Sequence, residues 1–461
     1  MSELKASKKW WLVLIIAAIS FLALDLCFSF YQFYLFPLDG DFAGGIVPAG
    51  DVKPLLKDPF GFGLLFSGEG HANPNRYFSH LLFYHYFRIL PGFFQLFFDP
   101  VTSLYLSVAL MKGLVHIGFL ISIPLIIKEI NKKIPILFSL VGVTAFLQTC
   151  GYGNYIQLVD KSISYLFFYG LPLMVLGFFV WFWIRVNKKT GWTLFTYTKL
   201  GGFLLFLAFS GPLTAPLMAL FLLFWMGYQH RRGFLKQRHF ILSGVVFLVC
   251  AYSFFLGKFN TVFFQENISV LERYQRIPLG LWNTLTGKPW WLFYALPFVL
   301  FRLIFSEKWK AFKWDIFWFV LAAIALYLLL LPLGGYRPYR PLILRFDTFA
   351  PVYFCLIIGF ISLTGSMLVE LENQRKQIIA GSIMLVFILV FTNADRFPKR
   401  DNSVEKEQLY SIMNSGCLDC KVDAEQFFNW PGIPKTDFEL DQKSLILLGI
   451  SNKELKISGK R

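Results

Sequence analysis

The stretch WWLVLIIAAISFLALDLCFSFYQFYLF, residues 10–36, decides the fold class of this chain. It exceeds the roughly 7–15 apolar residues of a signal-peptide core and lacks a small-residue cleavage site. A helix of about 20 apolar residues crosses the hydrocarbon layer of a membrane, so we expect a first transmembrane helix here. Lys5, Lys8 and Lys9 precede it and place the N-terminus in the cytoplasm, because basic residues are retained on that side.

Further apolar stretches of comparable length follow along the 461 residues, and charged residues are largely confined to the linkers between them. Only 16% of the residues are charged, against about 25% in ordinary soluble domains, and 56% are hydrophobic. We therefore expect an all-α membrane protein, a polytopic helical bundle of about 11 transmembrane helices. The expected spans are 10–36, 102–127, 134–151, 165–184, 192–210, 212–229, 240–257, 289–305, 314–333, 347–369 and 377–394.

The linkers after alternate spans are basic, which defines one cytoplasmic face. Their basic residues are Lys128, Lys132, Lys133, Arg185, Lys188, Lys189, Arg231, Arg232, Lys236, Arg238, Lys308, Lys310, Lys313, Arg375 and Lys376. The alternation requires that 192–229 contain two short spans joined at Gly211-Pro212. A single span with an interfacial helix would move Arg231 and Arg232 to the outside, so we favour two spans.

The net charge of +16 raises the question of a nucleic-acid partner. Most Lys and Arg residues flank apolar spans, where they set topology and contact anionic membrane lipids. We therefore expect no nucleic-acid binding. The topology predicts a multi-pass protein, which we expect in a bacterial inner membrane, with a cytoplasmic N-terminus and a periplasmic C-terminus.

The topology divides the chain into a transmembrane domain, 1–394, and a small external C-terminal segment, 395–461. The first external loop, 37–101, is the longest loop between spans. Its aromatic part, 77–98, carries charge and is interrupted by Pro91, so we expect two short interfacial helices rather than a span. The other external loops would be 152–164, 258–288 and 334–346.

The sequence Asp39-Gly40-Asp41 stands where the first helix leaves the membrane. A carboxylate beside low-dielectric lipid can have a raised pKa and serve as a general base. Asp-Gly is also ordinary turn chemistry, so a polar turn is the competing interpretation.

A second group of polar residues follows in the same loop. His71, Asn73, Asn75, Arg76 and His80 could bind a substrate or acceptor through hydrogen bonds. Their spacing matches no standard zinc motif, so a metal site and a purely structural role remain alternatives.

A third group lies in the loop before the span 347–369. Arg337, Arg340 and Arg345 are external, where topology does not favour basic residues, and Tyr336 and Tyr339 lie among them. The planar guanidinium fork matches phosphate oxygens. We therefore expect a binding site for a lipid phosphate or pyrophosphate, with ordinary head-group contact as the alternative.

Other polar residues add to this picture. Arg273 and Arg276 in the preceding external loop could help to bind phosphate. Asp25 lies within the first span, where a carboxylate is costly and is usually functional or paired. Cys417 and Cys420 form a CxxC sequence without the βαβ context of a redox domain, so we expect a structural disulfide in an oxidising compartment.

With these residues in view, the chain resembles the GT-C superfamily of polytopic membrane glycosyltransferases, which use polyprenyl-phosphate-linked sugars. An acidic motif follows the first helix, here Asp39 and Asp41, and its loop continues into interfacial helices, here about 77–98. A late external loop enters a helix with an Arg-aromatic-then-Pro pattern, here Arg345-Phe346 and Pro351. The resemblance concerns organisation over about 390 residues. Gly40 separates the acidic residues that many members have adjacent, and Phe346 stands where Tyr is frequent.

The resemblance implies a transferase of the cell envelope. Asp41 or Asp39 would act as base on an acceptor hydroxyl, and the external arginines would stabilise the departing polyprenyl phosphate. The acceptor could be a lipid, a glycan or a protein. No certain cofactor is implied, and assistance by a divalent cation is left open.

Two other functions compete with this one. A transporter or lipid flippase often has inverted repeats and charged residues at mid-membrane, whereas this chain shows no repeat and only Asp25 deep in a span. A non-catalytic assembly protein would explain the C-terminal segment but not the external arginines.

Overall fold

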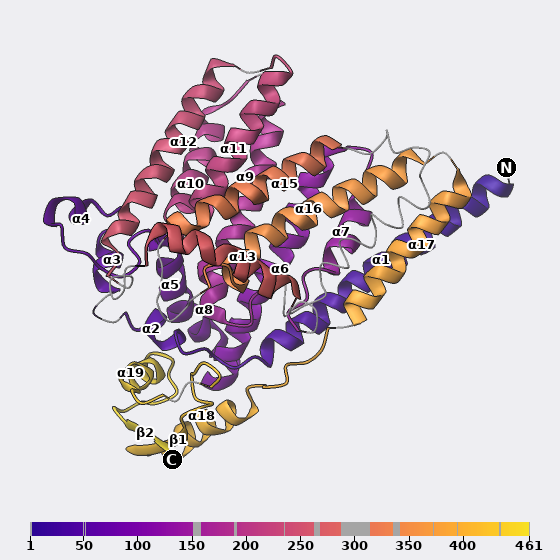
Figure 1. The fold of residues 1–461 in the computed structure, drawn as a ribbon. Coiled ribbons are helices and arrows are strands. Elements are labelled where there is room, and N and C mark those ends of the chain that lie inside the picture. The colour runs from indigo at the N-terminus through magenta and orange to yellow at the C-terminus, as the bar shows by residue number, and fades with distance from the viewer. Residues whose placement is uncertain are drawn as a thin grey trace.

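The computed structural model describes residues 2–48, 50, 52–150, 158–188, 191–234, 236–261, 268–286, 314–334, 342–371, 373–393, 395–432 and 435–460. The expected span 289–305 lies outside these residues, as do Tyr336, Arg337, Tyr339 and Arg340. Within them the chain is almost entirely helical, with a single two-stranded sheet. Figure 1 shows a tilted bundle of long helices with the C-terminal segment packed against one end.

Among the described residues, seven helical stretches are long and apolar enough to cross a membrane, which indicates an integral multi-pass membrane protein. They are Leu12–Tyr34, Pro100–Ile130, Ile163–Asn187, Gln237–Phe259, Asp315–Leu333, Asp347–Glu370 and Arg375–Asn393. The long helices of the bundle are α1 (Ser2–Tyr34), α6 (Pro100–Ile130), α9 (Leu171–Asn187), α10 (Leu194–Ala208), α11 (Thr214–Arg231), α12 (Gln237–Leu256), α15 (Trp314–Leu330), α16 (Phe346–Glu370) and α17 (Gln374–Asn393). Helices α10 and α11 divide 192–229 into two, as expected.

The bundle has two chemically different ends. The end against which the C-terminal segment packs, here called the tail end, holds the end of α1 and the beginnings of α6 and α16. The opposite end gathers basic residues of successive linkers: Lys128, Arg185, Arg231, Arg232, Arg375 and Lys376. The structure therefore brings the basic linkers together, which is the arrangement that a membrane with one cytoplasmic face favours.

The first loop forms four helices at the tail end: α2 (Phe42–Ile46), α3 (Lys53–Lys57), α4 (Phe62–Ser67) and α5 (Tyr77–Phe94). Phe78 N–H, in the first turn of α5, donates to Phe209 O after α10, and Gln95 just after α5 donates to Leu448 O in the C-terminal segment. Both ends of α5 thus lie at the tail end, so α5 does not cross the bundle.

One detail of that loop differs from the expectation. Residues 77–98 form one helix and a following turn, not two helices separated at Pro91. Proline removes a backbone donor and clashes with the preceding turn. Pro91 lies in the last turn of α5, where only three more helical residues follow, so it shortens the helix without dividing it.

The expected span 134–151 is only partly helical. Helix α7 covers Ile136–Thr144, and the chain then continues as irregular buried backbone to Cys150. Cys150 N–H donates to the Asp395 carboxylate at 2.9 Å, so irregular backbone at this depth finds a partner within the protein. Phe146 packs between Phe360 and Phe387, which fixes the irregular segment in the core.

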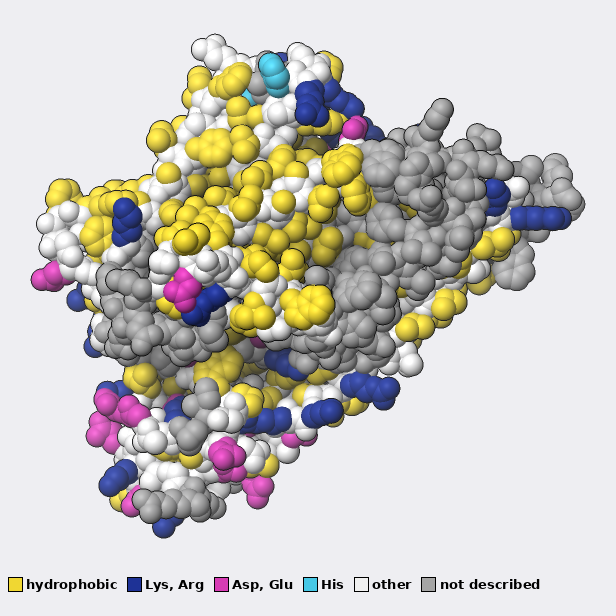
Figure 2. Space-filling model, in the orientation of Figure 1, with side chains coloured by type: hydrophobic (Ala, Val, Ile, Leu, Met, Phe, Trp, Pro, Cys, Tyr) yellow, Lys and Arg dark blue, Asp and Glu magenta, His cyan; other side chains and the backbone are white. Residues whose placement is uncertain are grey.

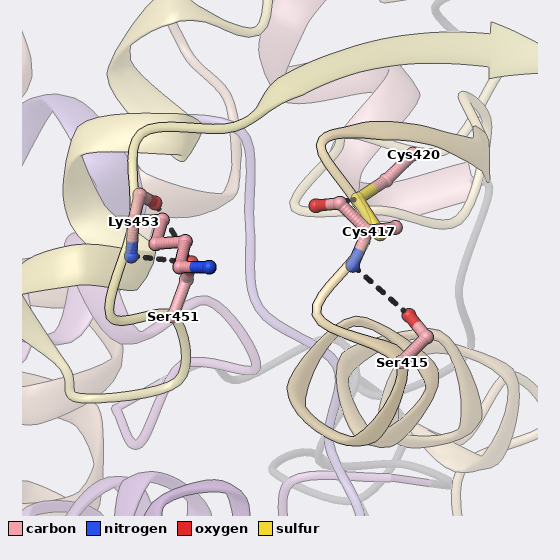
Figure 3. Close-up of a disulfide and its surroundings, with 5 residues drawn as sticks. All are labelled: Ser415, Cys417, Cys420, Ser451 and Lys453. Carbon is pink, nitrogen blue, oxygen red and sulfur yellow. Dashed lines mark hydrogen bonds between the residues drawn. A yellow bond between two sulfur atoms is a disulfide. The ribbon is translucent and has the colours of Figure 1, made fainter.

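The C-terminal segment is a small folded unit with α18 (Ser403–Ser415), β1 (Asp419–Asp423), α19 (Glu439–Leu447) and β2 (Lys456–Lys460). Strands β1 and β2 pair in parallel. The expected disulfide between Cys417 and Cys420 is present and closes the turn from α18 into β1 (Figure 3). The segment is docked through α18, because Asn402 donates to Tyr34 O and Phe36 O and its backbone N–H to Leu35 O.

The surface is consistent with this division. Hydrophobic side chains cover much of the described middle of the bundle face, whereas charged side chains of both signs gather on the C-terminal segment (Figure 2). Of the four free cysteines, Cys150 and Cys250 are buried and Cys355 is partly buried, as expected of small apolar residues. Cys27 is exposed on the apolar helix α1, where it would face lipid.

Candidate functional site

The Asp39-Gly40-Asp41 turn lies at the tail end, directly after α1. Asp39 is buried and its carboxylate accepts three hydrogen bonds: from Ser162 Oγ at 2.7 Å, from Ser164 N–H at 3.0 Å and from Asp41 N–H at 3.0 Å. These contacts tie the first loop to the segment before α8 (Ile163–Tyr165). Asp41 is exposed and precedes α2, so only the second carboxylate faces the surface.

The segment that holds Asp39 is itself fixed by a buried lysine. Lys112 of α6 is fully buried and donates to the backbone carbonyl of Asp160 at 3.1 Å and to that of Lys161. Its ammonium also lies 4.4 Å from the centre of the Phe36 ring. Burial raises the pKa of the Asp160 carboxyl, while the Ser162 N–H and Lys112 oppose that rise. These contacts of Lys112 and Asp160 hold in place the segment that binds Asp39.

The next residues form a π-helical turn. The turn η2, Leu166–Gly170, joins α8 to α9 and follows Tyr165. The rings of Tyr165 and Tyr169 lie 5.5 Å apart, centre to centre. Single π-turns inside α-helices are rare and occur often at functional sites. Here the π-turn carries Tyr169, and Tyr165 directly precedes it at the tail end.

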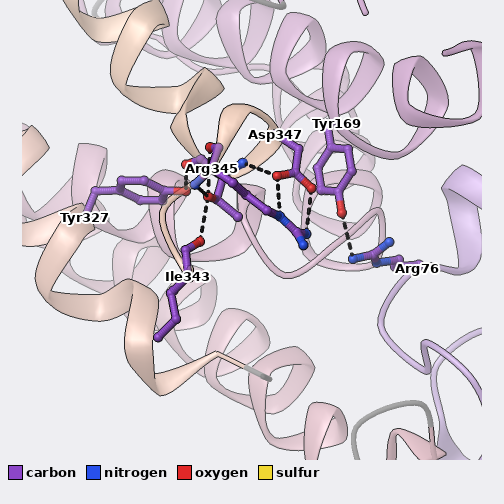
Figure 4. Close-up of polar contacts among 7 residues, drawn as sticks. Arg76, Tyr169, Tyr327, Ile343, Arg345 and Asp347 are labelled. Carbon is purple, nitrogen blue, oxygen red and sulfur yellow. Dashed lines mark hydrogen bonds and ion pairs between the residues drawn. The ribbon is translucent and has the colours of Figure 1, made fainter. Parts of the chain in front are cut away.

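The beginning of α16 contributes an ion pair. Arg345 Nε and Nη2 donate to the two oxygens of Asp347 at 2.6 and 2.7 Å (Figure 4). Thr348 N–H also donates to Asp347, and Tyr327 Oη donates to Thr348 O at 2.6 Å. Asp347 is buried, whereas about a quarter of the Arg345 side chain is exposed. The Arg345 guanidinium therefore has further N–H groups that do not donate to Asp347.

A small pocket opens beside this pair. Its wall is formed by η2, by the α10–α11 turn and by the first turns of α16, including Tyr169, Asp347 and Pro351. Arg76 approaches from the first loop and donates to Tyr169 Oη at 3.4 Å (Figure 4). Its guanidinium lies 5.7 Å from the centre of the Phe168 ring.

His80 lies one helical turn after Arg76. Its ring centre is 4.7 Å from that of Phe168. Burial, helped by the neighbouring Arg76, lowers the pKa of His80 to about 3, so its imidazole is neutral. Of the predicted acceptor residues, Arg76 and His80 therefore face the η2 aromatic residues.

The structure thus brings two predicted groups of site residues toward one place. Asp39 accepts from Ser162 and from Ser164 at the beginning of α8, and Arg345 lies close enough to Tyr165 and Tyr169 to interact electrostatically. Asp347 likewise acts on the buried Asp160. Carboxylates, guanidinium groups and tyrosines from the first loop, η2 and α16 therefore share one site at the tail end.

Comparison with known proteins assigns no family to this arrangement. No family model matches the chain, and neither a characterised protein nor a solved structure does.

Other predicted site residues lie elsewhere. His71 pairs with Asn260 in an isolated bridge, Asn73 N–H donates to the Asn260 side chain, and Asn75 donates to Ser253 O. These contacts attach the loop to the end of α12. They correspond to the structural alternative for this group.

The two arginines of α13 (Val270–Thr286) have local partners. Arg273 Nη1 donates to Pro332 O and Gly334 O, and Arg276 forms an ion pair with Glu272 on the same helix. Arg273 therefore attaches α13 to the end of α15, while neither residue is shown to reach the pocket. Among the residues that the structure describes, no three His, Cys, Asp or Glu side chains come together in a way that could hold a metal ion.

Several residues of the site were not singled out from the sequence. Asp347 ends the arginine-rich stretch, and Asp160 is an acidic residue just before an expected span, so charge at a span boundary could have indicated both. Tyr165 and Tyr169 lay unmarked at the start of an expected span. Their i, i+4 spacing makes them neighbours on a helix, but no local signal indicates that they lie near Arg345.

Proposed function

We propose that this protein is a membrane glycosyltransferase of the GT-C type. It would transfer a sugar from a polyprenyl-phosphate or polyprenyl-pyrophosphate donor to an acceptor on the external side of the membrane. The proposal includes about 11 spans, a cytoplasmic N-terminus at the basic end, and external chemistry at the tail end.

One observation carries the proposal: acidic and basic groups from distant parts of the chain meet at the tail end. Asp39, two residues before Asp41, accepts from Ser162 and Ser164 just before η2. Arg345 interacts electrostatically with Tyr169 and Tyr165, whose rings lie 5.5 Å apart. A transferase for a phosphate-linked sugar needs a base near the acceptor and cations near the leaving phosphate.

The arginines would bind the phosphate. Arg345 uses two of its N–H groups on Asp347 and Arg76 uses one on Tyr169, which leaves other donors on both forks. The pair with Asp347 is neutral, so Arg345 would act through directed hydrogen bonds more than through net charge. The pocket lies at the ends of apolar spans, where a prenyl chain can remain in lipid.

Asp41 is the better placed of the two predicted bases. Its side chain is exposed, whereas Asp39 accepts three hydrogen bonds and holds the turn in position. A carboxylate saturated with donors is a poor proton acceptor. We therefore assign proton removal from the acceptor hydroxyl to Asp41 and positioning of the turn to Asp39.

The proposal is tested with purified protein in proteoliposomes and a panel of radiolabelled polyprenyl-phosphate sugars. We expect sugar to move to an acceptor in wild type and in Glu69→Gln, which changes an exposed carboxylate of the same loop. Asp41→Asn should slow transfer by about 10²–10⁴. Full transfer by Asp41→Asn would contradict the assigned role, and absence of transfer from every donor in wild type would contradict the function.

A transporter remains the second candidate because of one intramembrane contact. Asp25 Oδ2 of α1 and His116 Nε2 of α6 lie 3.9 Å apart, and both side chains are buried. Paired ionisable groups within a membrane often mark ion or substrate paths. Uptake of labelled lipid-linked sugar that survives Asp41→Asn but is lost in His116→Ala would favour transport over transfer.

A further inference from the structure

The C-terminal segment places one loop over the Asp39-Gly40-Asp41 turn. The loop Phe427–Pro431 follows β1, and its first two rings are fully buried and stacked 4.6 Å apart. Phe428 packs edge-on against Phe42 of α2, with ring centres 5.7 Å apart. These two phenylalanines attach the loop to the first external loop.

The loop has an unusual backbone that is held from several sides. Phe428 has a φ of +43°, a left-handed conformation that is rare for a bulky residue. Asn429 Nδ2 donates to Ala424 O at 2.8 Å, and Lys435 Nζ donates to Phe428 O at 2.9 Å. Strained conformations of this kind persist only where the surroundings enforce them, and they cluster at functional sites. Here the strained residue directs the next side chains.

Trp430 is the residue of this loop that contacts the acidic turn. A Cβ atom on Gly40 would lie 2.6 Å from Trp430 Cδ1, so the indole sits directly on the middle residue of the acidic turn. Its ring centre lies 5.0 Å from that of Tyr165. Trp430, Tyr165 and Tyr169 therefore form a continuous row of rings from the acidic turn toward the pocket that Tyr169 and Asp347 line.

Packing on Gly40 and Tyr165 leaves part of the Trp430 side chain accessible. Phe427 and Phe428 are completely buried, but Trp430 remains partly exposed. Its indole N–H makes no hydrogen bond within the part of the chain that the structure describes, and its Nε1 would lie 2.9 Å from a Cβ at Gly40. An aromatic face and a donor are thus both presented beside the exposed Asp41.

We infer that Trp430 is a substrate-contacting residue: the ring and N–H of the C-terminal segment form a platform for a sugar at this site. The inference rests on the proposed function and adds the C-terminal segment to it. The C–H face of a pyranose is apolar and packs on an aromatic ring, while its hydroxyls accept hydrogen bonds. The sugar would lie on the row of rings with its phosphate toward Arg345. The side of the anomeric carbon opposite the phosphate would then face the acceptor hydroxyl near Asp41, and the C1–O bond to the phosphate would break as the hydroxyl attacks.

The test compares two probes that differ only in the sugar. A C20 prenyl phosphate, bare or carrying a hexose or N-acetylhexosamine, is titrated against the full-length protein in nanodiscs. We expect Trp430→Ala to weaken the glycosylated probe about tenfold and to leave the bare probe within twofold. Trp430→Phe keeps a ring but loses the N–H, so its loss should be smaller. Trp318→Ala, an exposed tryptophan on α15, should change neither affinity.

The possible results distinguish the sugar platform from the proposed transferase function. Equal weakening of both probes by Trp430→Ala, or no change in either, would overturn the sugar platform while leaving the transferase intact. Failure of wild type to prefer the glycosylated probe over the bare one would count against both the platform and the proposed function. Retained affinity for the bare probe shows in the same experiment that the variant is folded.

Discussion

Asp39 and Asp41 are separated by one glycine and have different environments. Asp39 is buried with three donors to its carboxylate, and Asp41 is exposed at the start of α2. The sequence offered both as the catalytic base without a strong preference. Hydrogen-bond geometry separates them, because a residue that fixes a turn and a residue that accepts a proton require opposite surroundings.

The first prediction concerns the exposed carboxylate. Asp41→Asn should lower the rate of sugar transfer by about 10²–10⁴, because Asn cannot accept a proton. Binding of the donor and the unfolding temperature should stay near wild type. Asp39→Asn should lower the unfolding temperature as well, because one carboxylate oxygen becomes an NH₂ group that cannot accept, so either the two serine donors or the Asp41 N–H lose their acceptor. Transfer kinetics and thermal unfolding in detergent measure both, and equal unfolding temperatures would count against the positioning role.

The second prediction concerns the ion pair at the start of α16. Arg345→Ala leaves the buried Asp347 without its bidentate partner, which costs up to about 3–5 kcal/mol for a buried pair and less here because Arg345 is partly exposed. Both the unfolding temperature and the affinity for prenyl phosphate should fall. Lys at this position should restore only part of the affinity, because it offers a point charge without a fork.

A double variant separates the two effects. Arg345→Ala with Asp347→Asn removes the unpaired charge, so the unfolding temperature should recover relative to Arg345→Ala alone. Affinity for the phosphate should not recover. Recovery of both would mean that Arg345 serves only to neutralise Asp347.

Among the helices, the π-turn η2 determines how the residues of the candidate site are arranged. Gly170 ends η2, and a Cβ there would lie 2.8 Å from Leu158 O, so the backbone of the preceding segment needs this glycine. Gly170→Ala should push that segment away and disturb the serines that hold Asp39. We expect a destabilisation of about 1–3 kcal/mol, as for overpacking, and slower transfer.

Gly201 of α10 provides the matched control for Gly170. A Cβ at Gly201 meets no atom within 4 Å, so Gly201→Ala should be neutral or slightly stabilising. Thermal unfolding of the two variants in the same detergent makes the comparison. Similar behaviour of both would show that the close approach at Leu158 does not matter.

Helix α18 supplies a prediction about pH. Glu405 is buried and accepts from Leu38 N–H at 3.0 Å, and burial raises the pKa of its carboxyl to about 8. In the unfolded chain the carboxyl ionises near its ordinary pKa of about 4.3. Between these values the folded state binds the extra proton, so stability should fall as pH rises from about 4.3 toward 8.

The substitution Glu405→Gln should flatten that dependence, because the amide oxygen still accepts from Leu38 but cannot ionise. Glu407→Gln changes an exposed residue of the same helix and should leave the slope unchanged. Thermal unfolding of the wild type and both variants at pH 5, 6, 7 and 8 measures this pH dependence of stability. A wild-type protein that is more stable at pH 8 than at pH 5, with no change in Glu405→Gln, would contradict the role assigned to this carboxyl.

Much of the element order could be predicted from the sequence, because apolar length and basic linkers are local signals of a membrane span. The two helices within 192–229 are an example. The irregular segment after α7 and the π-turn at Leu166–Gly170 could not be predicted. Both depend on contacts with residues far along the chain, such as the hydrogen bond from Cys150 to Asp395. The spacing of apolar residues does not indicate such contacts.

The candidate site, like the fold, could be predicted only in part. Charged and aromatic types in external loops indicated Asp39, Asp41, Arg76 and Arg345 as candidates. The sequence could not show that Asp39 would be saturated with donors, because Ser162 and Ser164 stand about 120 residues away. The contribution of Trp430 depends on docking of the C-terminal segment, which is also nonlocal.

For the whole molecule, the gathering of basic linkers at one end makes a prediction about sidedness. In a variant without native cysteines, Asn452→Cys in the C-terminal segment should be labelled only from outside the membrane. Gly233→Cys, in the turn between α11 and α12, should be labelled only from the cytoplasm. A membrane-impermeant maleimide applied to whole cells and to inverted vesicles measures both. The reverse pattern would invert the proposed topology.

The packing of Trp430 on Gly40 has a consequence for biosynthesis. The acidic turn leaves the ribosome first, and its covering tryptophan follows roughly 390 residues later. At about 5–20 residues per second this interval is roughly 20–80 s. During that time a nascent chain already inserted in the membrane carries an uncovered turn and, on the proposal above, no sugar platform. Chains released early by a stop codon or protease would then be inserted yet inactive, so a cell would gain activity only from chains whose translation had passed Trp430.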